Sequence, residues 1–137
     1  MPEKLNKEFN VDYIPELEGP DELKARAELF SETWSYFEKE VFRVNRLKGL
    51  IKPGVERNAG EMIALMHSEL SECLEALRHG NKKSQVIDMT HAEEELADVL
   101  TRLMDFCFNR GFNLPKAFML KMQYNKTRPY RHGGKRF

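Results

Sequence analysis

The sequence predicts an all-α domain whose four helices pack as a four-helix bundle. Apolar residues recur every three or four positions along four separate segments, which is the spacing of one helix face. No segment of appreciable length alternates apolar and polar residues, as a half-buried strand would. Glycine or proline closes each of these segments. A chain of 137 residues, 41% of them hydrophobic, is long enough to bury one core and is expected to form one domain.

The first helix is expected over about residues 22–48. Asp21 is its expected N-cap, because a short acidic side chain can accept hydrogen bonds from the free backbone N–H groups of a first turn. Gly49 ends it. Its apolar face comprises Leu23, Ala27, Phe30, Trp34, Phe37, Val41 and Val44. The large ring of Trp34 is expected to anchor the core.

The second helix is expected to begin at Asn58 or Ala59 and to run to Gly80. Glycine readily takes the left-handed conformation that commonly follows the last helical residue. The apolar face comprises Met62, Ile63, Leu65, Met66, Leu70, Cys73, Leu74 and Leu77. Residues 81–89 are expected to form a connecting loop.

The third helix is expected to start after Thr90, because Glu93 three residues later completes a capping-box pattern. Gly111 ends this helix. Pro115 suits the first position of a fourth helix, where a missing backbone N–H costs nothing. The fourth helix is expected to end near Arg128, because the next residue is proline and disfavours helix before it.

Net charge at pH 7 is zero, but the charges are unevenly distributed. No Asp or Glu occurs from residue 106 to the end, while basic residues continue throughout. We therefore divide the chain into an extended segment (1–19), a helical domain (20–128) and a basic tail (129–137). A basic end after an acidic centre suits an anion site beside a metal site. A solubilising or nucleic-acid-binding tail is the alternative interpretation of the same charges.

No apolar run approaches the about 18 residues of a membrane-spanning helix. The N-terminus has no apolar core of the kind found in secretory signals. Cys73 and Cys107 fall on apolar helix faces, where reduced core cysteines are expected. These features predict a cytoplasmic protein that does not associate with membranes.

Two acidic pairs stand out, Glu69 with Glu72 in the second helix and Glu95 with Asp98 in the third. Residues three apart share a helix face. If the two helices pack side by side, four carboxylates can converge. Like charges in a partly dry site repel strongly, and a hard divalent cation relieves that repulsion. Oxygen ligands favour Mg²⁺, with Mn²⁺ as a possible substitute.

The positions on the helical wheel strengthen this prediction. Glu69 projects within the apolar arc of its helix, and Glu72 lies at the edge of the arc. A buried carboxylate is costly, so Glu69 requires a cation or a proton. Glu95 flanks the apolar arc of the third helix. Asp98 points further round, and only another helix or subunit would cover it.

The acidic pairs read as E-x-x-E, a gap of 22 residues and E-x-x-D, followed on the fourth helix by K-x-x-x-N-x-x-R and then RPYRHGGKRF. Over about residues 58–137 this pattern resembles the MazG-like superfamily of all-α nucleoside triphosphate pyrophosphohydrolases. That superfamily includes dimeric dUTPases, dCTP pyrophosphatases and phosphoribosyl-ATP pyrophosphatases. The resemblance rests on two acidic pairs on successive helices with a basic helix in the matching order.

The resemblance implies Mg²⁺-dependent hydrolysis of an NTP or dNTP to the monophosphate and pyrophosphate, with water attacking the α-phosphorus. It implies metal binding by Glu69, Glu72, Glu95 and Asp98, with Glu69 and Glu72 as the catalytic residues. It also implies contact with the phosphates or sugar by Lys121, Asn125 and Arg128, and assembly as a homodimer or homotetramer. From their charge we expect the tail residues Arg131, His132, Lys135 and Arg136 to close over the substrate.

Other classes are less well supported. No G-x-x-x-x-G-K-[ST] loop is present, which excludes a P-loop NTPase. No E-x-x-H motif occurs, which argues against a ferritin-like di-iron bundle, and His91 and the other histidines are expected to be structural or solvated. The remaining alternative is a non-catalytic helical module that binds nucleic acid through its basic tail. Such a module has no need for Glu69 within an apolar arc.

Overall fold

The computed structural model describes residues 20–129, and this part of the chain is all-α. It contains the four expected helices: α2 (Pro20–Leu47), α3 (Ala59–Arg78), α4 (His91–Arg110) and α5 (Leu114–Lys126). Over the described range the only β pairing is an isolated antiparallel bridge between Lys83 and Thr90, within the loop that joins α3 to α4. None of the described helices combines the length and the apolarity needed to cross a bilayer.

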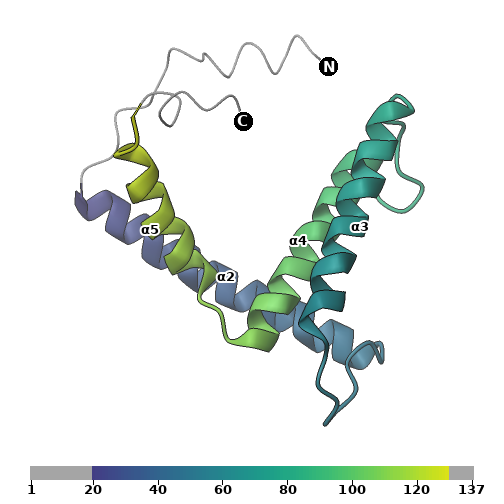
Figure 1. The fold of residues 1–137 in the computed structure, drawn as a ribbon, viewed down its shortest axis with the longest axis horizontal. Coiled ribbons are helices and arrows are strands. Elements are labelled where there is room, and N and C mark those ends of the chain that lie inside the picture. Colours follow the sequence, from purple (N-terminus) through teal and green to yellow (C-terminus); the bar gives the residue numbers. More distant parts are fainter. Residues whose placement is uncertain (1–19, 130–137) are drawn as a thin grey trace.

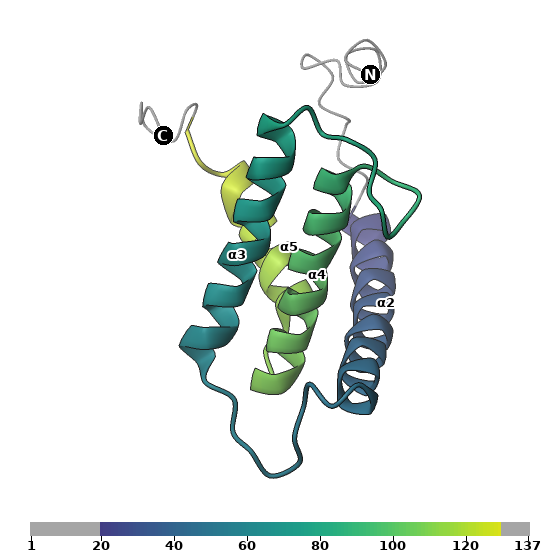
Figure 2. The same cartoon turned by 90° about the vertical axis from the view of Figure 1, so that its right-hand side faces the viewer.

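The four helices form an open V (Figure 1). Helices α3 and α4 pack side by side and make up one arm, while α5 makes up the other (Figures 1 and 2). Helix α2 runs along the base and packs against both α4 and α5. A single chain is therefore more open than the bundle expected from the sequence.

Local capping explains where the helices begin and end. Asn58 accepts a hydrogen bond from the Glu61 backbone N–H at the start of α3. The predicted capping box of Thr90 and Glu93 is present at the start of α4. Gly111 follows α4 with φ of 67°, a left-handed conformation that strains other residues. These hydrogen bonds satisfy backbone groups that a helix end leaves free.

Two boundaries differ from expectation. Helix α2 begins at Pro20, so Asp21 lies in its first turn rather than capping it. An acidic side chain still stabilises that position, because the N-terminal end of a helix carries partial positive charge. Helix α5 ends at Lys126, two residues before the expected Arg128.

Two small buried clusters hold the helices together. Trp34 of α2 packs with Met104 and Cys107 of α4, which confirms the anchoring role expected for this tryptophan. In the second cluster, Cys73 and Ala76 of α3 pack with Ala92 at the start of α4. Both cysteines are buried and free. Each cluster is small for a chain of this length.

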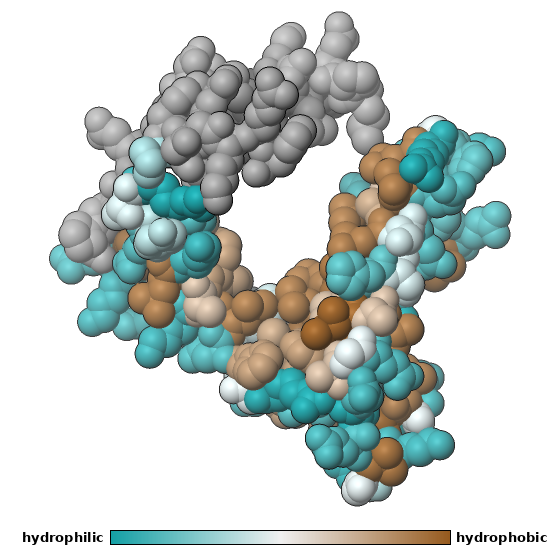
Figure 3. Space-filling model, viewed as in Figure 1, coloured by the Kyte–Doolittle hydropathy of each residue, from teal (hydrophilic) through white to brown (hydrophobic). Residues whose placement is uncertain are grey.

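Large apolar side chains remain exposed in the single chain. Figure 3 shows them along the side of the α3–α4 arm that faces the other arm. Among the exposed side chains of α3 and α4 are Leu65, Leu70, Leu74, Leu77, Leu96 and Leu100. Contiguous apolar surface of this kind is typical of a face that contacts another protein surface.

Candidate metal centre

Three carboxylates meet where α3 packs along α4. One oxygen from each of Glu69, Glu95 and Asp98 lies within 4.8 Å of the other two. Glu69 and Glu95 are each only 7% exposed, whereas Asp98 is exposed. The convergence expected from the spacing of the acidic pairs is therefore present for these three residues. Its cause is the shared helix face of residues three apart, combined with the side-by-side packing of the two helices.

Glu72 lies at the edge of this group. Its side chain is exposed, and it is not one of the three whose oxygens lie within 4.8 Å of one another. The Glu72 carboxyl is nevertheless close enough to Glu69 to lower the pKa of that side chain. The structure thus brings all four predicted carboxylates into one neighbourhood, with Glu72 nearest to solvent on the α3 side.

Arg102 supplies the cation that buried Glu69 requires. Its Nε and Nη2 each lie 2.6 Å from Oε1 of Glu69. Arg102 lies one helical turn after Asp98 on α4, on the same face. Sequence reasoning required a cation or a proton for Glu69 but did not identify this residue. The spacing of four between Asp98 and Arg102 does indicate that Arg102 lies on the acidic face of α4.

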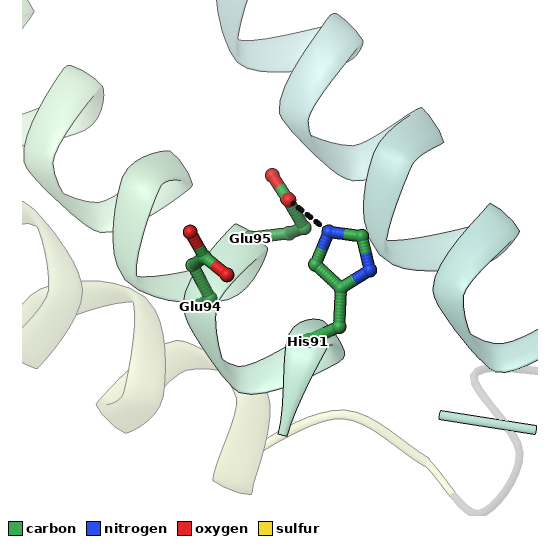
Figure 4. Close-up of side chains that lie close together, drawn as sticks. All are labelled: His91, Glu94 and Glu95. Atoms are coloured by element: carbon green, nitrogen blue, oxygen red, sulfur yellow. Dashed lines mark ion pairs between the residues drawn. The ribbon is translucent and has the colours of Figure 1, made fainter. Parts of the chain in front are cut away.

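His91 is the second partner that was missed. Its Nε2 lies 2.8 Å from Oε1 of Glu95, one turn further along α4 (Figure 4). His91, Glu94 and Glu95 also form a second group whose ligand atoms lie within 4.8 Å of one another. Glu94 is already engaged, because Ser84 Oγ donates to its Oε2 at 2.5 Å. His91 therefore orients Glu95, which is the structural role among the two, structural or solvated, that were expected for the histidines.

The electrostatics of the three carboxyls are uneven. Burial raises the pKa of Glu69, but the hydrogen bond and charge of Arg102, together with the nearby Glu72 carboxyl, outweigh burial, so the pKa of Glu69 lies below its ordinary value. Burial, followed by the charge of Glu72, raises the pKa of Glu95 despite the His91 ring. Burial and neighbouring carboxylates also raise the pKa of Asp98. Ionising all three together is thus unfavourable unless further positive charge is present.

This donor set fits a hard divalent cation. It consists of carboxylate oxygens from two rigid helices, and such ligands suit Mg²⁺ and Mn²⁺. A double positive charge would remove the repulsion that raises the pKa values of Glu95 and Asp98. Residues outside the group, such as His91, hold the ligands in orientation, as is typical of metal sites.

A cavity of about 590 Å³ opens beside Glu69 and Asp98. This volume lies within the range of small-molecule sites. Besides Glu69 and Asp98, its wall combines apolar side chains with amide, hydroxyl, acidic and basic groups: Leu50, Val55, Met62, Leu65, Asn45, Asn58, Thr101, Glu56, Glu61, Asp105, Arg57 and Arg102. The cavity therefore presents apolar and amide side chains together with carboxylates and two guanidinium groups.

A buried ion pair fixes the wall of this cavity. Arg57, just before α3, makes a bidentate contact with Asp105 of α4, with Nη1–Oδ2 at 2.6 Å and Nη2–Oδ1 at 3.0 Å. Arg110 Nη2 donates to the backbone carbonyl of Arg57 at 2.6 Å. The segment between α2 and α3 is thus tied to the acidic helix pair.

The predicted substrate residues of α5 lie elsewhere in the single chain. Lys121, Asn125 and Arg128 belong to or follow the helix of the other arm, which packs on α2 (Figure 1). Lys121 is exposed, with Nζ 4.7 Å from the ring centroid of Tyr124. The structure does not bring these residues to the acidic cluster within one chain. Arg131, His132, Lys135 and Arg136 lie outside the described residues.

Comparison with protein-family models, curated proteins and solved structures found no match to this chain. The shared site of Glu69, Glu95 and Asp98, together with the adjoining cavity, is therefore the basis for assigning a function.

Proposed function

We propose that this chain is a Mg²⁺-dependent nucleoside triphosphate pyrophosphohydrolase with a MazG-type fold. It would convert an NTP or dNTP to the monophosphate and pyrophosphate. The observation that carries the proposal is the convergence of Glu69, Glu95 and Asp98, two of them buried, at the edge of a cavity of small-molecule size. A binding module for nucleic acid has no use for buried acids beside a cavity.

In this proposal Glu69, Glu95 and Asp98 hold the divalent cation, with Mg²⁺ as the resident ion and Mn²⁺ as a substitute. When bound, such an ion screens the triphosphate charge and lowers the barrier to attack by water. Glu72 lies outside the group of three and close to Glu69, which suits it to accept a proton from the attacking water. The α-phosphorus is the site of attack, and pyrophosphate is the leaving group.

The cavity would take the nucleoside. Glu69 and Asp98 on its wall meet the cation and the phosphates. Its lining also includes apolar side chains and two amides, Asn45 and Asn58, with Glu56 and Glu61 close to Asn58 in the sequence. Amides offer both donors and acceptors to the edge of a base, while apolar side chains cover its faces.

The proposal also includes a second copy of the chain. The basic residues of α5 lie on the arm opposite the acidic cluster, and apolar side chains are exposed along α3 and α4. A homodimer, or a homotetramer built from it, would cover these apolar faces. It would also bring α5 of one copy toward the carboxylates of the other, so that Lys121, Asn125 and Arg128 contact the phosphates.

A pyrophosphate-release assay tests this function. The eight common NTPs and dNTPs are incubated with Mg²⁺ and then with EDTA. We expect release from at least one nucleotide, abolished by EDTA. Asp98→Asn should lower the rate by about 100-fold or more, because it removes a metal ligand.

The matched control is Glu75→Gln, which changes an exposed glutamate on α3 that contacts Arg78 and His79. Its rate should equal that of the unaltered chain. Equal rates for Asp98→Asn and the unaltered chain would remove the proposed metal centre. No release from any nucleotide, together with salt-sensitive nucleic-acid binding, would favour the binding module instead.

A further inference from the structure

The contact between Arg102 and Glu69 is asymmetric. Both Nε and Nη2 of Arg102 approach the same oxygen, Oε1 of Glu69, at 2.6 Å. A strong arginine–carboxylate pair instead places one donor on each oxygen. Both donors of Arg102 therefore contact Oε1 of Glu69, and Arg102 does not occupy the second carboxylate oxygen, Oε2.

The two partners also differ in their access to water. The Glu69 side chain is 9% exposed, whereas that of Arg102 is 38% exposed. A guanidinium on a long stem can turn into water or toward another anion, because only its stem needs to stay packed. The buried carboxylate has no such freedom and must keep a cation.

A second guanidinium lines the same cavity but is held differently. Arg57 contacts both oxygens of Asp105, and the two side chains are 19% and 11% exposed. Of these two cavity arginines, Arg102 is thus the one whose partner is also a predicted metal ligand and whose head group reaches solvent.

We propose that Arg102 is an exchangeable counter-ion: it neutralises Glu69 in the metal-free chain, and it turns into the cavity to bind a substrate phosphate once a divalent cation takes Glu69. This inference rests on the proposed function. The cation and the guanidinium compete for the same carboxylate. A cation on Glu69 releases Arg102 beside Asp98, at the end of the cavity where the triphosphate lies.

Two binding measurements test the exchange without relying on turnover. In the first, MnCl₂ alone is titrated into the full chain and free Mn²⁺ is measured by electron paramagnetic resonance. Arg102→Ala should bind Mn²⁺ about 10-fold more tightly, because the competing cation is gone. In the second, inorganic tripolyphosphate is titrated in saturating Mg²⁺. The same variant should bind it about 10-fold or more weakly, because a phosphate partner is lost.

Arg78→Ala is the matched control. Arg78 contacts the exposed Glu75 on α3, outside the cavity. It should change neither affinity. Should Arg102→Ala be unfolded in EDTA, we expect MnCl₂ to restore its helical circular dichroism, because the ion replaces the missing charge on Glu69. Failure of MnCl₂ to restore the fold would contradict the exchange.

The outcomes separate the exchange from the proposed function. Mn²⁺ binding by the unaltered chain with no tightening in Arg102→Ala would overturn the exchange and leave the metal centre standing. Tightening for Mn²⁺ without loss of tripolyphosphate affinity would overturn the role of Arg102 toward phosphate. Absence of Mn²⁺ binding in both proteins would overturn the metal centre and the exchange together.

Discussion

Replacing Asp105 by Asn should destabilise the whole chain more than its single charge would indicate. Asp105 is 8% exposed and holds Arg57 by two hydrogen bonds of 2.6 and 3.0 Å. The backbone carbonyl of Arg57 in turn accepts from Arg110. Asn has nearly the shape of Asp, so the change leaves no void. It leaves the Arg57 guanidinium with a weaker, neutral partner in a place that water reaches poorly.

The magnitude follows from burial. Removing one partner of a fully buried ion pair costs about 3–5 kcal/mol, because the other charge is stranded. The Arg57 and Asp105 side chains are 19% and 11% exposed, and the amide retains one acceptor. We therefore expect about 2–3 kcal/mol of lost unfolding free energy. For a domain of this size, that corresponds to a Tm about 10 °C lower.

Thermal unfolding followed by circular dichroism measures this change. Asp88→Asn is the control, because the Lys83–Asp88 contact joins side chains that are 73% and 91% exposed. Exposed pairs contribute little, so its Tm should move by less than about 2 °C. Equal Tm values for the two variants would refute the reasoning. So would strict additivity of Arg57→Ala and Asp105→Asn, since a direct contact requires coupling.

The remaining predictions concern the acidic centre and the start of α4. Glu95→Gln should raise the Tm in EDTA at pH 8. Folding raises the pKa of Glu95, so the folded chain loses stability as the pH rises from the ordinary pKa of 4.5 through the raised pKa, and glutamine removes this loss. Glu69→Gln should instead lower the Tm under the same conditions, because it weakens the contact with Arg102; shifts of the same sign in both variants would contradict this assignment of charges. Thr90→Ala should lower the unfolding free energy by about 1 kcal/mol in urea titrations, since it removes the α4 capping box, and an unchanged urea midpoint would show that the box adds nothing.

Features that depend on residues close together in the sequence were predicted correctly. Thr90 with Glu93 marks the start of α4 because a capping box involves only residues within one turn. Glu69 is buried, as its position within the apolar arc predicted, although Leu65, Leu70, Leu74 and Leu77 of the same arc remain exposed in the single chain. The convergence of the carboxylates needed one further assumption, that successive acidic helices pack side by side, and this was correct.

Features that depend on contacts across the fold were missed. Arg102 reaches Glu69 across 33 positions of sequence. Its spacing of four from Asp98 places it on the acidic face of α4, but it does not identify Glu69 as its partner. The open V likewise depends on where α5 packs along α2, and the expected bundle did not specify that. The helical pattern of α5 shows that it has an apolar side but not which helix covers it.

The position of an oxygen label tests the proposed reaction most directly. The chain is given Mg²⁺ and its best nucleotide in water enriched in oxygen-18, and both products are analysed by mass spectrometry. Attack on the α-phosphorus predicts one labelled oxygen in the nucleoside monophosphate and none in pyrophosphate. Label in pyrophosphate, release of orthophosphate or an absence of hydrolysis would each contradict the account.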